Sequence, residues 1–341
     1  MATMKEIARL AGVSQATVSR VINGAENVHP EIRERVMRWV RELDYQPNAN
    51  ARSLKQRRSN LLGVVLPGIS NPFFPDVVHA VLRESYRHGR SVLLFESGGN
   101  AYHEWRCIQR LYAHRVEGML LVPVDPEAPH LKRLKSMEIP AVVLTQEIDG
   151  FPSVSIDHRE GGRLVARHFL DLGHVDVAFL GARRDPKLAG FRAALLDAGI
   201  PFGDERVIEC RAWHEEATYE AYLRTKEFFQ QAGRPPVSAL FAYNDLAAIG
   251  ALRAFEELGL SVPDDVSLAG FDNTSLSAVA RPALTTVAQP TQEIGSIATD
   301  LLLEWIESGE ADESPVTLAP RLVVRESTTG AMVRAAGEAS R

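Results

Sequence analysis

The sequence predicts a small all-α unit at the N-terminus, followed by an α/β body of two doubly wound parallel-sheet lobes. In the first sixty residues, apolar side chains recur at helical spacing. From residue 61 onward, short apolar runs alternate with amphipathic helical stretches, which favours parallel sheets covered by helices. The charge also changes there: residues 1–58 hold 11 Lys and Arg against 6 Asp and Glu, whereas the remainder holds 27 against 38. A basic module on an acidic body is typical of polyanion binding, and clustering on a solvated face is the alternative.

Length and composition exclude several classes of protein. The 341 residues correspond to about two domains, and 45% hydrophobic with 24% charged residues is ordinary globular composition. Two cysteines are too few for a disulfide framework or a thiolate zinc site. No apolar run reaches the roughly 18 residues of a membrane span, and the first residues lack the pattern of a signal peptide. We therefore expect a cytoplasmic protein.

Two short helices are predicted near the N-terminus. Thr3 and Glu6 have the spacing of a capping box, and Gly12 ends this first helix. Ser14 can cap a second helix, from residue 15 to about residue 23. The apolar positions expected to be buried are Ile7, Leu10, Ala11, Val18, Val21 and Ile22. Two short helices joined by a tight glycine turn form a helix-turn-helix, whose second helix fits the DNA major groove.

A third helix is predicted from Pro30 to about Leu43, because proline is favoured at the first helical position. His29 precedes it, where serine or threonine would cap better. The next polar segment, residues 49–55, has too little apolar content to hold a helix by packing. These features predict a headpiece over residues 1–47 and a hinge or linker over residues 48–59.

The body, residues 60–330, is expected to form two lobes, because its candidate strands are too numerous for one compact sheet. Candidate strands cover residues 62–66, 92–95, 119–122, 141–144, 177–180, 239–242 and 266–269, with helices such as 77–88 and 163–172 between them. The lobes are placed at 60–157 and 158–284, with the chain crossing back near 285–290 and again near 320. The tail, 331–341, has no apolar heptads for a coiled coil. Ligands of such sheets bind at the carboxyl ends of the strands, here between the lobes.

The run from Lys5 to Gly24 (KEIARLAGVSQATVSRVING) resembles the DNA-binding headpiece of the LacI/GalR repressor family, as does the run from Glu42 to Leu54 (ELDYQPNANARSL). The body resembles the same family, whose core has a periplasmic binding protein-like fold. The segments that carry this second resemblance are 63–74, 115–121, 172–174, 189–194, 243–252, 262–272 and 282–290. The resemblance extends over essentially the whole chain, to about residue 328.

The resemblance implies that Gln15, Ala16 and Arg20 contact base edges, with arginine suited to guanine and glutamine to adenine. Phosphate contacts or helix caps are expected from Ser14, Thr17, Asn23 and His29. The linker is expected to add Asn48, Arg52, Leu54 and Lys55. In the family the linker leucine wedges into the minor groove, and the alternative for Leu54 is an exposed leucine without a role.

Positions carried over from the family also outline an effector site in the cleft. They are Asn71, Phe73, Phe74, Thr145, Lys187, Trp213, Asn244, Asp272 and Gln289. These residue types suit a polyol, because Asp272, Asn244 and Lys187 can bind hydroxyls while Phe74 and Trp213 can stack on a sugar face. Structural alternatives remain: Asn244 can cap the helix after its strand, and the two phenylalanines can belong to the lobe core.

Two positions depart from the family pattern. Lys187 stands where many relatives have arginine, and lysine lacks the planar fork of a guanidinium. Thr145 stands where sugar binders often have aspartate. The segment 181–187 is also shorter than usual, and its Arg183 and Arg184 add positive charge. A sugar acid or sugar phosphate is therefore one prediction for the ligand, and a solvated loop is the alternative for these arginines.

The expected function is that of a homodimeric transcription regulator, a repressor, which binds palindromic operator DNA under control of a sugar or sugar derivative. One alternative is a regulator that uses a corepressor or a protein partner, and another is a cytoplasmic solute-binding protein without a DNA role. An enzyme on a doubly wound fold is the third. The sequence contains no dinucleotide-binding, phosphate-loop, nucleophile-elbow or zinc-protease motif. We expect no catalytic residue, no metal and no cofactor.

Overall fold

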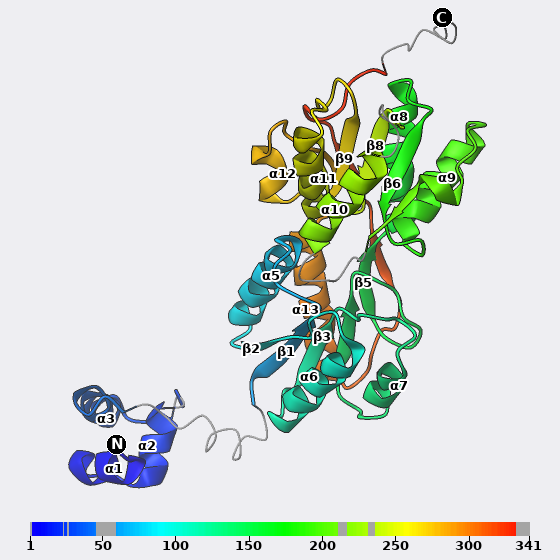
Figure 1. The fold of residues 1–341 in the computed structure, drawn as a ribbon. Coiled ribbons are helices and arrows are strands. Elements are labelled where there is room, and N and C mark those ends of the chain that lie inside the picture. Colours follow the sequence, from blue (N-terminus) through cyan, green and yellow to red (C-terminus); the bar gives the residue numbers. More distant parts are fainter. Residues whose placement is uncertain are drawn as a thin grey trace, which may run out of the picture. The chain divides into compact units, whose positions relative to one another are not determined.

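The structure is a computed structural model of the chain, and it describes residues 2–22, 24–25, 27–45, 59–210, 217–230 and 236–331. The chain divides into two compact units, Met1–Ser59 and Asn60–Arg341. Figure 1 draws the first unit in dark blue at the start of the colour bar. Among the described helices, none combines the length and the apolar character needed to cross a lipid bilayer.

The first unit is a three-helix bundle around one small core. Its helices are α1 (Met4–Ala11), α2 (Gln15–Ile22) and α3 (Pro30–Glu42). The Thr3 hydroxyl accepts a hydrogen bond from the Glu6 amide at 3.2 Å, and Gly12 ends α1 in the left-handed conformation with φ 63°. The buried apolar side chains are Ile7, Ala8, Ala11, Val18, Val21 and Val36. Leu10, which was expected in the core, is only half-buried, whereas Ala8 is buried because α1 packs against both α2 and α3.

The first lobe is built on a six-stranded sheet in the described residues, with the order β11-β5-β4-β3-β1-β2 and parallel pairing throughout. Its strands are β1 (Leu61–Leu66), β2 (Ser91–Glu96), β3 (Gly118–Leu121), β4 (Ala141–Leu144), β5 (Ser153–Ile156) and β11 (Val316–Leu318). The helices that cover it in the described chain are α5 (Phe73–Arg87), α6 (Ala101–Ala113), α7 (Pro129–Lys135) and α13 (Thr291–Ser308). Alternate residues of β1 face opposite layers: Leu62 and Val64 pack with α5 and α13, while Val65 packs with α6 and α7.

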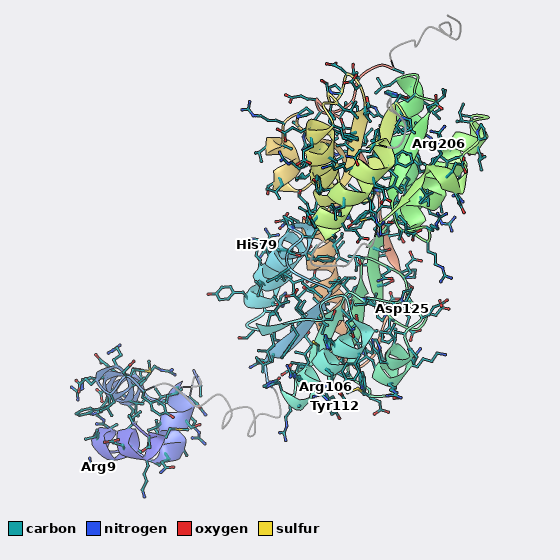
Figure 2. The ribbon with its side chains drawn as sticks, in the orientation of Figure 1. Arg9, His79, Arg106, Tyr112, Asp125 and Arg206 are labelled. Carbon is teal, nitrogen blue, oxygen red and sulfur yellow. The ribbon has the colours of Figure 1, made fainter. Side chains whose placement is uncertain are left out.

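The side chains of α6 illustrate this layering. Leu111 and Ile108 are buried against the sheet, whereas Arg106 and Tyr112 project from the outer side of the helix in Figure 2. A helix with one apolar and one polar side covers a sheet in this way.

The second lobe repeats the plan, with the strand order β12-β10-β9-β8-β6-β7. Its strands are β6 (Val177–Gly181), β7 (Val207–Glu209), β8 (Ala239–Ala242), β9 (Ser267–Asp272), β10 (Thr285–Ala288) and β12 (Arg321–Val323). Only β12 pairs antiparallel within this described sheet. The helices pack in two pairs, α8 (His158–Asp171) with α9 (Pro186–Asp197), and α10 (Ala217–Gln230) with α11 (Asp245–Glu257). A 3₁₀ turn (Asp204–Arg206) precedes β7, and the short α12 (Ser275–Val279) packs against α11.

Three short connections in the described chain link the lobes. Strand β5 ends in the first sheet and α8 begins two residues later in the second lobe. Strand β10 lies in the second sheet, whereas α13, which begins at Thr291, packs on α5 and on the first sheet. The last connection runs from β11 to β12, between Leu318 and Arg321. Short connections of this kind allow the two lobes to change their relative orientation by small backbone rotations.

Two glycines allow α8 and α9 to approach closely. A Cβ atom added to Gly162 would lie 1.9 Å from the carbonyl oxygen of Lys187, and one added to Gly190 would lie 1.8 Å from that of Arg159. The atoms in the way are backbone atoms, which cannot move aside as a flexible side chain can. This close contact therefore fixes the start of α9, which carries Lys187.

We expect Gly162→Ala to lower the free energy of unfolding of the body by about 3 kcal/mol, because the added methyl group forces the helices apart. Urea unfolding followed by tryptophan fluorescence measures this. The matched control is Arg167→Ala, an exposed position on the same helix, with an expected change within about 0.5 kcal/mol. Equal stability of Gly162→Ala and wild type would contradict the proposed role of this contact.

Candidate functional site

The exposed face of α2 presents Gln15, Ala16 and Arg20, the three residues predicted to contact bases. The opposite face of α2 is anchored, because Val18 and Val21 are buried in the headpiece core. A short helix with this division presents a rigid polar surface, which is what insertion into a DNA groove requires.

The polar residues around α2 have local structural roles. Ser14 Oγ accepts a hydrogen bond from the Thr17 amide at 3.1 Å, and the two hydroxyls are 2.9 Å apart. Ser14 therefore caps α2, as expected. His29 is exposed and makes no side-chain capping bond to α3. The remaining predicted contacts lie outside the described residues and stay predictions: Asn23, Asn48, Arg52, Leu54, Lys55 and, in the cleft, Trp213.

At the contact between the lobes, where the sequence predicts the cleft, the central group is the carboxylate of Asp272, the last residue of β9. Its Oδ2 accepts a hydrogen bond from Asn71 Nδ2 at 3.0 Å, and its Oδ1 accepts one from Gln289 Nε2 at 2.7 Å. Asn71 belongs to the first lobe, where its Oδ1 accepts from the Phe73 amide at the start of α5. Gln289 lies between β10 and α13, on one of the connections. Asp272 therefore bonds the second lobe both to the first lobe and to a hinge segment.

A second buried carboxyl group belongs to Asp245, the first residue of α11. Its Oδ2 accepts hydrogen bonds from the Thr274 amide at 2.7 Å and the Thr274 hydroxyl at 3.0 Å, and its Oδ1 accepts from the Thr286 hydroxyl at 2.6 Å. Burial, followed by the charge of Asp272, raises the pKa of Asp245 to about 7. Burial also raises the pKa of Asp272 to about 6, against the opposing effects of Lys187, Asn71 and Gln289.

Lys187 is paired within its own lobe. Its Nζ lies 3.4 Å from Asp185 Oδ2 and 4.8 Å from the centre of the Phe271 ring. Asp185 also caps α9, because its Oδ1 accepts from the Lys187 amide at 2.8 Å. The ammonium group is therefore balanced by one carboxylate and held over an aromatic face.

Thr145 lies at the end of β4 with φ 68°, a conformation that non-glycine residues seldom adopt. Its carbonyl oxygen accepts a hydrogen bond from His158 Nε2 at 2.9 Å, and the His158 ring is 5.9 Å from the Phe271 ring. Burial, followed by the charge of Lys187, lowers the pKa of His158 to about 4. His158 is therefore neutral at physiological pH.

Sequence reasoning missed His158, together with Asp185, Asp245 and Phe271. A signal existed for His158, because it is the first residue of the helix that follows the first crossing between lobes. The other three lie within two residues of predicted site residues, at the ends of strands or the starts of helices, and that placement is a signal for them.

Three of the predicted cleft residues have the structural roles that were the alternatives to ligand binding. Asn244 caps α11, since its Oδ1 accepts from the Ala247 amide at 2.8 Å. Phe73 and Phe74 are both buried in the lobe core, with ring centres 5.1 Å apart in an edge-to-face arrangement. Ligand contact by these three residues stays a prediction.

The arginines near the cleft are neutralised or exposed. Arg183 forms ion pairs with Asp204 at 3.0 Å and Glu209 at 2.7 Å, and Arg184 is exposed to solvent. Among the described side chains, the groups that meet in the cleft are therefore carboxylates, amides, one neutral imidazole and one paired ammonium. This set can bind hydroxyl groups.

Two family models match the chain. Residues 3–48 match the model described as bacterial regulatory proteins, lacI family, and residues 166–328 match that of a periplasmic binding protein-like domain. The HTH-type transcriptional repressor PurR of Vibrio parahaemolyticus is 34% identical to this chain over 337 residues, which cover 95% of this chain and 98% of that protein.

Solved structures resemble the chain over nearly its full length. The lac repressor dimer bound to operator and the anti-inducer ONPF has a TM-score of 0.83 at 29% identity, covering 96% of this chain and 99% of that one. A complex of the transcriptional regulator CelR with cellobiose has a TM-score of 0.71 at 30% identity, covering 96% and 100%. The predicted fold class, a helix-turn-helix headpiece followed by two parallel-sheet lobes, is confirmed. These relatives are transcription regulators and not enzymes, and this chain belongs to the lacI family of bacterial regulatory proteins.

Proposed function

We propose that the chain is a homodimeric repressor that binds palindromic operator DNA through α2, and that a sugar or sugar derivative bound around Asp272 controls its operator affinity. The observation that carries the proposal is the carboxylate of Asp272, which bonds Asn71 of the opposite lobe and Gln289 of a connection. A ligand hydroxyl that donates to this carboxylate competes with Asn71 and so weakens a hydrogen bond between the lobes. The lac repressor dimer on its operator and the CelR–cellobiose complex support both halves of the proposal.

DNA recognition is assigned to the exposed face of α2. Arg20 can donate two hydrogen bonds to a guanine edge, and Gln15 can bond an adenine edge. One eight-residue helix reads few base pairs, so a twofold dimer that reads two half-sites doubles the specific contact. The basic headpiece and linker add phosphate contacts that depend on salt. Because such a protein acts on chromosomal DNA, we also propose that it resides in the cytoplasm.

Ligand control is assigned to the arrangement of the lobes. A ligand shifts a conformational equilibrium only by binding one state more tightly than the other. The Asn71–Asp272 bond exists only while the lobes are close, so it distinguishes the two states. The sign of the ligand effect on operator binding separates an inducer from a corepressor.

We expect Arg20→Ala to weaken binding to the selected operator by about 1–3 kcal/mol more than binding to random DNA, because a base contact is lost. Fluorescence anisotropy at fixed salt measures both affinities. The matched control, Arg35→Ala, removes the same charge from an exposed position on α3. Equal losses of affinity for operator and random DNA in Arg20→Ala would show that Arg20 does not contact bases.

The prediction for Lys55→Ala is an equal loss of affinity for operator and random DNA, measured in the same way.

Asp272→Ala should retain operator binding and lose the ligand response, because the headpiece is a separate unit while the central acceptor of the cleft is gone. The measurement is operator release across a panel of sugars, with sugar affinity determined by calorimetry. We expect sugar affinity to fall about tenfold or more, as for a lost hydrogen bond to a charged group. Asp171→Ala, an exposed position at the end of α8, is the control. An unchanged sugar response in Asp272→Ala would exclude Asp272 from the site.

A further inference from the structure

Two buried acceptor atoms in the cleft have no hydrogen-bond partner within the part of the chain that the structure describes. They are Nδ1 of His158 and Oε1 of Gln289. A buried polar atom without a partner is costly, so native proteins seldom leave one unless water, an ion or a ligand completes it. Hydroxyl groups of a ligand are donors that could complete both atoms.

Whether each atom is a donor or an acceptor follows from the hydrogen bond that the other polar atom of the same side chain makes. His158 Nε2 faces the carbonyl oxygen of Thr145, so it carries the ring proton. The lowered pKa keeps the ring neutral, and Nδ1 therefore has a free lone pair. Gln289 Nε2 faces the carboxylate of Asp272, which leaves the carbonyl oxygen as the other end of the amide.

Both atoms belong to the neighbourhood of Asp272. Gln289 is bonded to Asp272 directly. The His158 ring lies against Phe271, the residue before Asp272, and the charge of Lys187 acts on the pKa of both His158 and Asp272. These contacts place the three acceptors in one region, around Asp272 and Lys187.

The charges around these acceptors disfavour an anionic ligand. The ammonium of Lys187 is already paired with Asp185. Arg183, one of the two arginines that suggested a sugar acid or phosphate, is bound by Asp204 and Glu209, and Arg184 is exposed. What remains is the carboxylate of Asp272 with two neutral acceptors. Such a set repels an anion and accepts hydrogen bonds from hydroxyl groups.

We infer that His158 Nδ1, Gln289 Oε1 and the Asp272 carboxylate accept hydrogen bonds from hydroxyls of one uncharged sugar, and that they select it against sugar acids and sugar phosphates. This inference rests on the proposed function, in which the cleft holds the effector. It adds the charge class of the ligand and assigns His158 a role in specificity.

The informative variant is His158→Gln. The glutamine amide nitrogen takes the place of Nε2 and can still donate to the Thr145 carbonyl. Its Oε1 is bonded to the same terminal carbon and so does not take the position of Nδ1, next to Cγ. The matched control is His168→Gln on the same helix, whose imidazole pairs with the Thr328 hydroxyl. Operator binding and the melting temperature report whether each full-length variant is folded.

Calorimetry on the full-length protein compares neutral hexoses, pentoses and cellobiose with gluconate and glucose 6-phosphate. We expect binding of a neutral sugar and none of the two anions. We expect His158→Gln to weaken that sugar about tenfold, the size of one lost hydrogen bond, and His168→Gln to match wild type.

Three outcomes would overturn the inference. One is that the wild-type protein binds gluconate or glucose 6-phosphate more tightly than glucose. Another is wild-type sugar affinity in folded His158→Gln, and the third is failure of every neutral sugar to bind. Failure of the proposed function is distinguishable, because it appears as the absence of any enriched palindrome in a selection of bound genomic DNA.

Discussion

The hydrogen bond between Asn71 and the Asp272 carboxylate is the contact that makes the arrangement of the two lobes sensitive to a ligand. Each partner is placed by a strand end or helix start that the local sequence dictates. Asn71 stands before α5, which its own side chain helps to begin, and Asp272 ends the fully buried β9. Because the bond crosses from one lobe to the other, the cleft is closed by a group that a ligand can also bind.

The fold could be predicted from the sequence wherever a strand is an uninterrupted apolar run. The predicted 62–66, 141–144 and 239–242 coincide with β1, β4 and β8 to within one residue. Strands β5 (Ser153–Ile156) and β10 (Thr285–Ala288) were missed, although nearly all their residues are buried. Their serines and threonines hide the apolar signal, and their burial arises from tertiary packing that no local pattern shows.

In the candidate site, too, some residues could be predicted from the sequence, while others are brought together only by tertiary packing. The family resemblance predicts Thr145 and Asp272, and both lie at strand ends, where ligands of parallel sheets bind. Pairings such as that of His158 with the Thr145 carbonyl depend on two segments that meet only in the folded lobe. Asn244 shows a further limit, because a residue that caps a helix and a residue that meets a ligand have the same sequence signature.

Local energetic costs around Asp272 explain how a small molecule could move the lobes. Thr145 and Asp272 hold positive φ angles, and the charge of Asp272 opposes ionisation of the buried Asp245 carboxyl, whose pKa is raised. A ligand that supplies hydroxyl donors here satisfies acceptors that the protein leaves open. The free energy recovered favours the lobe arrangement that fits the ligand, and the connections at 156–158, 288–291 and 318–321 transmit that arrangement through the body.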